Sequence, residues 1–501
     1  MDVVIAIDAS TTGTKAIAFT TDGDVRAIGR ASVERSSPVP TWHEQDPLQW
    51  WSSTASALTS VMALLHSNGD TPVAVGITHQ RESFVCLDRS FDPIRPAILW
   101  VDARAGSEVK RLGSAEVHRI SGKPPSITPS MYKIAWLNEH EPETMAQTAY
   151  LSDVHGYLSR MLTGTFVTSS ASADPMGMVD ISTGEWSQTL LDLVGVTAEM
   201  LPGIVKPGTI IGSVTDDAAA ATGLPVGLPI VAGGGDGQCA GLGVGVLSPR
   251  SAYLSLGSSI VLGSHSDNAE PSSAYRLLES PLGHGHTIEA YVASGALSVS
   301  WFTRTFCADD EDADDVLSEG LDRSVPGARG LFFLPYLSGA STPYWDEDAR
   351  GAFIGADDGH TRDDFYRAVI EGLVYEIRLL AEGLHSAGSA IEEVHATGGG
   401  AASEHWLQII ADVLNLPVRS STSPEATALG AAILAASAIG FAGKDLREAS
   451  ARMSHVHRTF TPQPDSVARY ESLYRIYREV YPALAPIFNK HRDLTRDTTG
   501  R

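Results

Sequence analysis

Asp8 and the turn after it combine residue types that can bind phosphate and a divalent cation. Asp8 ends an apolar run, and Thr11, Thr12 and Lys15 follow it with small residues between them. Small residues let backbone N–H groups approach an oxyanion, hydroxyls add donors, and a lysine adds charge. A carboxylate in this place can hold Mg²⁺ through water. An ordinary hairpin turn would use the same residues, so this segment alone leaves both interpretations open.

A second candidate is Asp236, a single carboxylate among glycines. Residues 233–235 and Gly237 are all glycine and follow an apolar run. Glycines allow substrate atoms to come close, so we expect an open loop that presents Asp236 as a general base. A turn that needs a positive φ is the structural alternative. Gly235-x-Gly237-x-x-Ala240 also matches a dinucleotide fingerprint, but no acid ends a strand about 20 residues further on.

A third glycine run, Gly398–Gly400, is followed by Ala401 and a helix-like segment at residues 404–412. A helix N-terminus has unpaired N–H groups, and glycines make a flat floor on which a base or a phosphate can lie. Simple strand-to-helix packing would produce the same pattern. The G-x-x-x-x-G-K-[ST] phosphate loop does not occur in the sequence. A nucleotide would therefore have to be held by several separate glycine turns.

Polar side chains suited to a polyol follow two expected strands. Gln80, Arg81 and Glu82 come after the apolar residues 73–77, and Trp100 ends another apolar run. An adjacent Arg–Glu pair offers a donor fork and an acceptor, which matches vicinal hydroxyls. The tryptophan would stack on the aliphatic face of the polyol. A surface ion pair is the alternative for the two charges.

Other catalytic and metal motifs are weaker. His284-x-His286 could ligate a metal, but no further Cys or His near it has metal-like spacing, so we expect ordinary loop residues. The sequence contains neither H-E-x-x-H nor G-x-S-x-G, which removes the commonest zinc-protease and serine-hydrolase signatures.

Strand and helix patterns alternate along the chain, which indicates an α/β fold. An apolar run, a turn of small residues and a second apolar run occupy residues 3–19, and the same order returns at residues 252–263. This repeat predicts two related domains that face each other. The other main expected elements are helices at residues 48–65 and 362–384 and strands at residues 73–77 and 393–397.

Composition limits the classes of function. The 501 residues include 36 Lys and Arg against 60 Asp and Glu, a formal net charge of −24, which argues against nucleic-acid or anionic-membrane partners. Three distant cysteines argue against a disulfide framework. Residues 426–443 carry no charge, but they are mostly Ala and Gly, so we expect a helix buried against a sheet rather than a membrane span. We therefore expect a soluble, cytoplasmic protein.

In this order, these segments resemble the FGGY carbohydrate kinase family of the sugar kinase/Hsp70/actin superfamily. The resemblance runs from about Val3 to Ala436. Five further runs carry it: Trp42–Pro47, Leu334–Gly339, Thr342–Asp346, Arg350–Phe353 and Glu425–Ala432.

The resemblance implies an α/β protein with two ribonuclease-H-like (actin-like ATPase) domains flanking a catalytic cleft. Residues 1–247 would bind the substrate and residues 248–489 would bind ATP. Residues 490–501 are polar in sequence, so we expect a frayed tail there. A homodimer is also implied. The implied cofactors are ATP and Mg²⁺, and catalysis would rest on positioning and charge neutralisation.

Residue roles carried over from the family are as follows. Asp236 looks like the catalytic base, and Asp8 resembles the acid that holds Mg²⁺ through water. The implied phosphate and nucleotide contacts are Thr11, Thr12 and Lys15 in the first phosphate loop, Gly257, Ser258 and Ser259 in the second, and Gly399, Gly400 and Ala401 in the adenosine loop.

The implied substrate lies between two branches of the family. Gln80, Arg81 and Glu82 with Trp100 resemble the polyol-holding set of glycerol kinases, whereas the sequence around Asp236 is closer to xylulose kinases. Two departures from glycerol kinases enlarge the pocket, namely Thr128 in place of a Tyr and Val261 in place of a Phe. Xylulose kinases in turn carry Met-His where this chain has Arg81-Glu82.

We therefore expect ATP-dependent phosphorylation of a four- or five-carbon polyol or ketose, such as xylulose, xylitol or a related pentitol or tetritol. Glycerol is the alternative substrate. A non-catalytic ATP-binding sensor of the same fold is a second alternative, against which the acids at Asp8 and Asp236 speak. An NAD-linked oxidoreductase, based on the glycine fingerprint alone, is the third.

Overall fold

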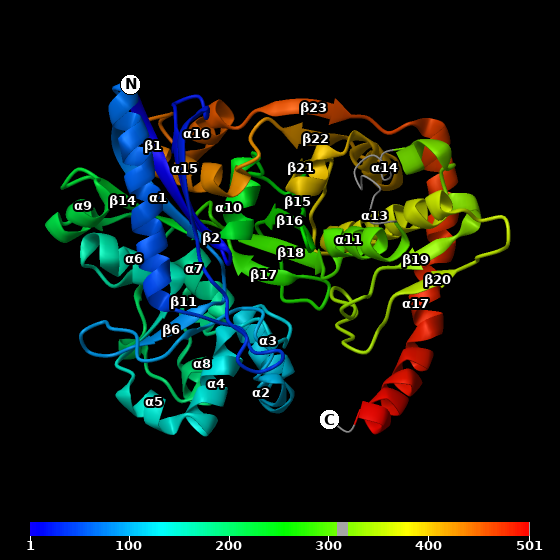
Figure 1. The fold of residues 1–501 in the computed structure, drawn as a ribbon, viewed down its shortest axis with the longest axis horizontal. Coiled ribbons are helices and arrows are strands. Elements are labelled where there is room, and N and C mark those ends of the chain that lie inside the picture. Colours follow the sequence, from blue (N-terminus) through cyan, green and yellow to red (C-terminus); the bar gives the residue numbers. More distant parts are fainter. Residues whose placement is uncertain (308–318, 500–501) are drawn as a thin grey trace.

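The computed structural model describes residues 1–307 and 319–499, and it contains two large sheets, one in each half of the chain (Figure 1). The N-terminal sheet has the order β13-β14-β5-β1-β2-β3. Its strands are β1 (Asp2–Ala9), β2 (Gly13–Phe19), β3 (Val25–Ser32), β5 (Thr71–His79), β13 (Ile210–Ser213) and β14 (Pro229–Gly235).

The C-terminal sheet has the order β17-β18-β16-β15-β21-β22-β23. Its strands are β15 (Ser251–Leu256), β16 (Ile260–Ser266), β17 (Arg276–Glu279), β18 (His286–Val292), β21 (Glu393–Thr397), β22 (Val418–Ser421) and β23 (Val456–Phe460).

The two sheets share one core topology. In the N-terminal sheet β1 pairs with β2 and β2 with β3 in antiparallel fashion, while β1, β5 and β14 are parallel. In the C-terminal sheet β15, β16 and β18 form the antiparallel part, and β15, β21 and β22 are parallel. Each half therefore has the strand order 3-2-1-4-5. This confirms the expected α/β fold with two ribonuclease-H-like domains.

The expected helices form with recognisable ends. Helix α1 (Pro47–Asn68) begins after Asp46, whose side chain accepts the Leu48 N–H, and it ends at Gly69 with a left-handed φ of 70°. Helix α13 (Arg362–Ser386) begins with a capping box between Thr361 and Asp364. Both helices agree with the amphipathic patterns in the sequence.

Strand β1 is apolar throughout because both of its faces are buried. Val3, Ile5 and Ile7 pack in the cluster that contains residues of α1, α6 (Val154–Thr163) and α9 (Asp216–Thr222). Val4 and Ala6 face the other way, into the cluster with α15 (Ala426–Ala438). A continuous apolar run is typical of a strand that is covered on both faces.

Helix α15 lies in the C-terminal half of the sequence but packs on the N-terminal sheet. It contacts β1, β5 and β14 of the N-terminal sheet, and α10 (Asp236–Gly243) lies against it. Helix α16 (Leu446–Met453) belongs to the same apolar cluster. Most of the uncharged segment at residues 426–443, from Ala426 to Ala438, is thus a helix buried against a sheet, as expected. A C-terminal segment of the chain supplies part of the N-terminal core.

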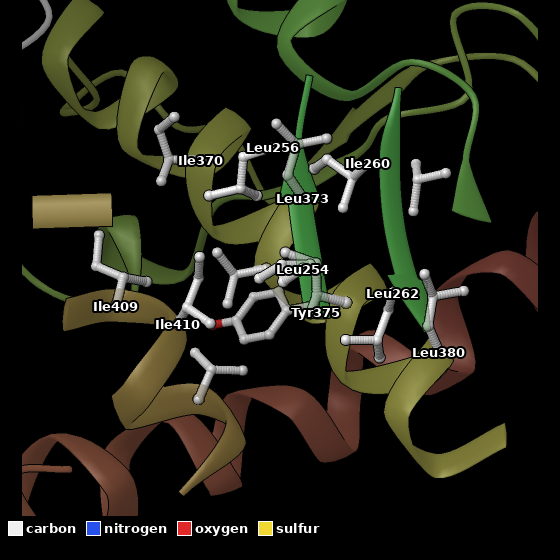
Figure 2. Close-up of a cluster of buried hydrophobic side chains, with 14 of the residues drawn as sticks. Leu254, Leu256, Ile260, Leu262, Ile370, Leu373, Tyr375, Leu380, Ile409 and Ile410 are labelled. Atoms are coloured by element: carbon white, nitrogen blue, oxygen red, sulfur yellow. The ribbon is translucent and has the colours of Figure 1, made fainter. Parts of the chain in front are cut away.

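The C-terminal core lies between the second sheet and its helices. Figure 2 shows Leu254, Leu256 and Ile260 of the β15–β16 hairpin against Leu373 and Tyr375 of α13. Helices α11 (Gly295–Phe306), α14 (Glu404–Leu414) and α17 (Pro464–Thr499) complete this half. Helix α17 continues to Thr499, so the polar tail expected from residue 490 begins within this helix.

The remaining elements form an inserted subdomain and short connections. They are β4 (Glu44–Gln45), β6 (Phe84–Leu87), β7 (Ala97–Ile98), β8 (Tyr150–Asp153), β9 (Val167–Ser169), β10 (Val179–Asp180), β11 (Glu185–Trp186), β12 (Gly203–Val205), β19 (Phe332–Leu334), β20 (Ala352–Ile354), α2 (Gly106–Leu112), α3 (Ala115–Ser121), α4 (Ser130–His140), α5 (Pro142–Gln147), α7 (Ser170–Ala173), α8 (Gln188–Val194) and the short 3₁₀ turns η1 (Asp174–Met176), η2 (Ala198–Met200), η3 (Ala328–Gly330) and η4 (Gly399–Ala402). Among the described residues, no helix is long and apolar enough to cross a membrane.

Candidate active site

A cavity of about 410 Å³ lies between the two halves of the chain. On the N-terminal side, the wall of the cavity contains five residues that the sequence analysis named as candidates. On the C-terminal side, it contains the β15–β16 turn and side chains of the strands behind that turn. The lining residues used below are Arg81, Glu82, Trp100, Thr128, Asp236, Tyr253, Gly257, Ser258, Ser259, Val261 and Arg276. Asp236 and the turn at residues 257–259 therefore line one cavity.

Asp236 is the first residue of α10, directly after β14. Its side chain is 47% exposed, and one carboxylate oxygen accepts the Gly237 N–H at 2.8 Å. The expected glycine loop is wrong, because residues 233–235 are the end of strand β14. A Cβ at Gly233 would collide with the carbonyl oxygen of Ile77, so glycine is required there by the close approach of β5.

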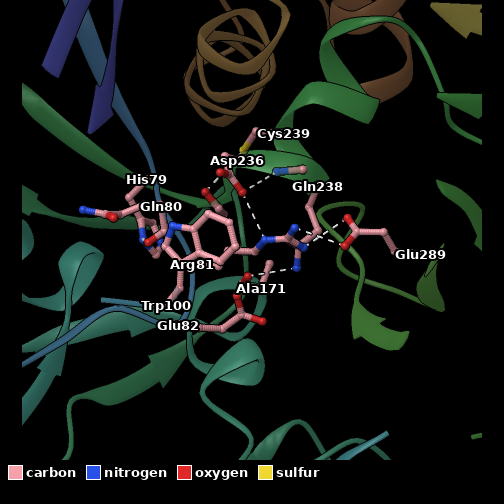
Figure 3. A network of polar contacts seen from close by, with 12 residues as sticks. His79, Gln80, Arg81, Glu82, Trp100, Ala171, Asp236, Gln238, Cys239 and Glu289 are labelled. Atoms are coloured by element: carbon pink, nitrogen blue, oxygen red, sulfur yellow. Dashed lines mark hydrogen bonds and ion pairs between the residues drawn. The ribbon is translucent and has the colours of Figure 1, made fainter. Parts of the chain in front are cut away.

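Arg81 joins Asp236 to the C-terminal half (Figure 3). Its Nε lies 3.0 Å from Asp236 Oδ1, and its two terminal nitrogens each lie 3.1 Å from an oxygen of Glu289. Glu289 lies on β18 and is fully buried. The guanidinium thus forms a fork-to-fork pair with one carboxylate and a single contact with the other. This arrangement fixes Arg81 and aligns Asp236 beside the cavity.

Glu82 is held by a second pair across the same boundary. Arg276 of β17 donates to Glu82 Oε1 at 2.9 Å and also contacts Glu289. The Tyr253 hydroxyl donates to Glu289 at 2.7 Å. Burial alone would raise the pKa of Glu289, but Arg81 and Arg276 outweigh burial and lower it to about 2. Glu289 is therefore an anion that links two arginines.

Sequence reasoning missed Glu289, Arg276 and Tyr253. Each is a polar residue in a short, mostly buried strand, namely Ser251–Leu256, Arg276–Glu279 or His286–Val292. A charged residue inside a buried strand is a weak signal, since it indicates a partner without saying which one.

Gln80, Thr11 and Trp100 form a hydrogen-bonded wall. Thr11 Oγ1 donates to Gln80 Oε1 at 2.9 Å, and the Trp100 indole N–H donates to Thr11 Oγ1 at 3.1 Å. Gln80 is almost fully buried, and its amide also donates to Gln45. Thr11, expected in the phosphate loop, is therefore joined to the residues expected to bind substrate. Gln80 supports this wall from behind.

Lys133 is a buried residue that orients two parts of the cavity. Its Nζ donates to the carbonyl oxygen of Thr128 at 2.7 Å and to that of Trp100 at 3.2 Å. Burial lowers the pKa of this lysine to about 8. The sequence alone assigned no role to Lys133. The structure shows that it connects the two segments that carry Thr128 and Trp100.

Asp8 is buried near the end of β1 and lies close enough to Asp236 for the two carboxylates to repel each other. Burial, followed by the negative charge of Asp236, raises the pKa of Asp8 to about 7. The backbone of Lys15 lies opposite that of Asp8 in the β1–β2 hairpin. The side chain of Lys15 forms its ion pair elsewhere, since Nζ lies 2.6 Å from a carboxylate oxygen of Glu425, just before α15. Thr12 is exposed at the tip of the turn. A buried acid next to a second acid is a site that a divalent cation would stabilise.

The expected adenosine loop lies at the end of β21 and faces a different cavity. Ala401 and Gly398 line a space of about 310 Å³ together with residues 420–424. A Cβ on Gly400 would lie 2.7 Å from the Trp406 ring, whereas a Cβ on Gly399 would meet nothing within 4 Å. Gly399 and Gly400 belong to the short turn η4, so the predicted strand–glycine–helix unit is present.

Comparison with known proteins identifies the family. Residues 3–243 match the N-terminal domain, and residues 252–439 the C-terminal domain, of the FGGY family of carbohydrate kinases. A xylulose kinase of Bacillus subtilis is 30% identical, with 96% of this chain and 97% of that protein covered. A xylulose kinase of Escherichia coli is 31% identical, with 96% and 99% covered. A solved gluconate kinase from Lactobacillus acidophilus superposes with a TM-score of 0.92 at 26% identity, over 98% of this chain and 99% of that one.

Fold, shared cavity and relatives together define a two-domain sugar kinase. The chain belongs to the FGGY family of carbohydrate kinases and is an ATP-dependent enzyme. The expected family is confirmed, and the oxidoreductase interpretation of the glycine fingerprint is wrong.

Proposed function

We propose that this kinase transfers the γ-phosphoryl group of ATP to a hydroxyl of a four- or five-carbon polyol or ketose, with xylulose, xylitol or a related pentitol or tetritol as the candidates. The observation that carries the proposal is the cavity in which Asp236 faces the turn at residues 257–259. Phosphoryl transfer needs an oriented hydroxyl on one side and neutralised phosphate oxygens on the other. The xylulose kinases among the relatives support the substrate class.

In this proposal Asp236 is the general base. Its half-exposed carboxylate can accept the proton of a substrate hydroxyl, and the Arg81 contact at 3.0 Å keeps it oriented. Arg81 and Glu82 would contact the other hydroxyls from the cavity wall, and Trp100 would cover the carbon face. Because both charged residues are already paired with C-terminal partners, the substrate would meet them in a fixed orientation.

Asp8 would hold Mg²⁺ through water. The residues fit this role because Asp8 is buried and lies near Asp236. Burial and the negative charge of Asp236 both make the ionised form of Asp8 unfavourable unless a cation is bound. When bound, the cation would supply charge that stabilises the phosphate oxygens. In the chain itself, Ser258 and Ser259 offer hydroxyls at the cavity, while Thr12 and Lys15 lie at the first turn. Gly399, Gly400 and Ala401 would receive the adenosine part.

The side chains at two positions favour a substrate larger than glycerol. Thr128 and Val261 both line the cavity, and each is smaller than the aromatic residue expected in a glycerol kinase. Glycerol would leave part of a cavity of about 410 Å³ unfilled. The domain limits at residues 247 and 489, the Mg²⁺ site and the homodimer remain predictions.

A substrate panel tests the proposal. ATP consumption is measured by a coupled assay with glycerol, erythritol, threitol, ribitol, xylitol, D-xylulose, L-xylulose and D-ribulose. We expect the highest kcat/KM for a four- or five-carbon compound and a lower value for glycerol. A preference for glycerol would contradict the size argument, and a lack of turnover with the whole panel would contradict the substrate class.

A further inference from the structure

A cluster of two imidazoles and one carboxylate lies away from the cavity, at the far end of β16. His265 is the penultimate residue of β16, Asp267 follows the strand, and His284 is in the β17–β18 turn. One ring nitrogen of each histidine and one oxygen of Asp267 lie within 4.8 Å of one another. We propose that these three residues form a binding site for a divalent transition metal of the zinc class.

Hydrogen bonds orient both rings for coordination. His265 Nδ1 lies 3.3 Å from Ser280 Oγ, and His284 Nδ1 lies 3.2 Å from the carbonyl oxygen of Leu282. A histidine whose Nδ1–H is held by an oxygen keeps the Nε2 lone pair for a metal. The Nε2 atom of His265 lies 3.0 Å from Asp267 Oδ1, so in the metal-free protein its N–H donates to the carboxylate. A metal would take the place of this proton between the two ligands and release it to solvent.

The β17–β18 turn is shaped to bring His284 to the strand. Gly283 and Gly285 have φ values of 74° and 59°, a conformation that favours glycine, and they flank His284 on both sides. A Cβ on Gly285 would lie 2.6 Å from the His265 ring. Glycine is therefore needed at this position both for the backbone conformation and for the place of His265.

The ligand types select the class of ion. Imidazole nitrogen with a single carboxylate suits Zn²⁺, Co²⁺ or Ni²⁺, whereas Mg²⁺ prefers oxygen ligands and water. The phosphate turn at residues 257–259 lies before Ile260, at the other end of the same strand. Six residue steps of a strand span roughly 20 Å, so this site is separate from the phosphate turn and the cavity that it lines.

A metal here would join the end of β16 to the β17–β18 turn. Leu282 of this turn packs against the apolar cluster that includes α15 and the N-terminal sheet. The bound ion would therefore hold together segments that meet near the boundary between the halves. Because only the folded chain brings the three ligands together, the metal should raise the melting temperature.

The test uses protein without an affinity tag, treated with a chelator and titrated calorimetrically with ZnCl₂ at pH 7.5 in the presence of excess Mg²⁺. We expect one site with a Kd in the micromolar range or below. His284→Ala and Asp267→Asn should each weaken binding at least ten-fold, because each removes one ligand. Both residues are exposed, so the variants should keep the melting temperature of the metal-free protein.

His140→Ala is the matched control, since Glu108, Glu139 and His140 form the other histidine–acid cluster found in residues 1–307 and 319–490. This variant should bind Zn²⁺ as the wild type does. Co²⁺ should give d–d absorption bands with the wild type that disappear in His284→Ala. Equal Zn²⁺ affinity in the wild type and His284→Ala, or loss of binding in His140→Ala, would overturn the proposal.

Discussion

The two halves of the molecule place very different residues at equivalent positions of one topology. After the fourth strand in the core order, the N-terminal half has Gln80, Arg81 and Glu82, and the C-terminal half has three glycines at residues 398–400. After the fifth strand, the N-terminal half has Asp236, and the C-terminal half has Thr422.

This difference shows how a repeated fold can divide one reaction between two domains. Charged side chains at the strand ends can orient hydroxyls and accept a proton, whereas small uncharged residues leave room for a flat base and for backbone donors. The carboxyl ends of parallel strands are the usual position for ligands in such sheets. We infer that the N-terminal half carries the acceptor chemistry and the C-terminal half receives the nucleotide.

The largest expected effect comes from removing the charge of Asp236, which follows the fifth core strand of the N-terminal half and has only Thr422 as its counterpart in the C-terminal half. Asp236→Asn should lower kcat by about 10³-fold, since an amide cannot accept the hydroxyl proton. Steady-state kinetics with the best substrate of the panel measure this change, and calorimetry checks that substrate still binds. Thr422→Val, at the equivalent C-terminal position, should leave kcat within a factor of a few. An active Asp236→Asn enzyme would remove the assignment of the base.

A second change breaks the contact between the halves. Glu289→Gln should reduce the free energy of unfolding by about 3–5 kcal/mol, because it removes the anion shared by two buried arginines. Denaturant unfolding measures this quantity. Glu392→Gln in the same half is the control, since its pair with Arg250 is exposed and should contribute little. Equal unfolding midpoints for the two variants would show that the network does not couple the halves.

Asp8 should make stability depend on pH. Its pKa is about 7 in the folded protein and 3.8 in the reference state, so the folded state holds the proton more tightly. The contribution of Asp8 is therefore most favourable at low pH, and stability should fall by about 1.4 kcal/mol per pH unit as the pH rises from about 5 to 7. Asp8→Asn should remove this slope without Mg²⁺ present, while the exposed Asp24→Asn should retain it. An unchanged slope in Asp8→Asn would contradict the shifted pKa.

The smallest expected effect concerns nucleotide binding alone. Gly399→Val adds a side chain where a Cβ meets nothing within 4 Å, so the fold should be kept. If adenosine lies on this turn, KM for ATP should rise about ten-fold while KM for the sugar stays the same. Initial rates at varied ATP and varied sugar separate the two constants. A rise in the sugar KM instead would place the nucleotide elsewhere.

Local patterns made much of the fold predictable from the sequence. The apolar runs and amphipathic spacing located β1, β2, β15, β16, α1 and α13, because each of these patterns reflects burial of one element. The repeat of strand, turn and strand also predicted two related domains. By contrast, α15 was expected only to pack on some sheet, since nothing in its own residues says that its partner lies in the other half.

The site was predictable where a residue acts through its immediate neighbours. Asp236 among glycines and the turn at residues 257–259 are such cases. The roles of Glu289, Arg276 and Lys133 depend on partners that are distant in sequence, so no local pattern could assign them. For the same reason, the glycines before Asp236 resembled a loop, although the approach of β5 makes them part of a strand.

The division of the reaction between the two halves is tested most directly by a crystal structure with a non-hydrolysable ATP analogue and the preferred substrate bound together. We expect a substrate hydroxyl within hydrogen-bond distance of Asp236, with the γ-phosphate against residues 257–259 and the adenine beside Gly399. A substrate bound away from Asp236, or an adenine held by the N-terminal half, would contradict this assignment.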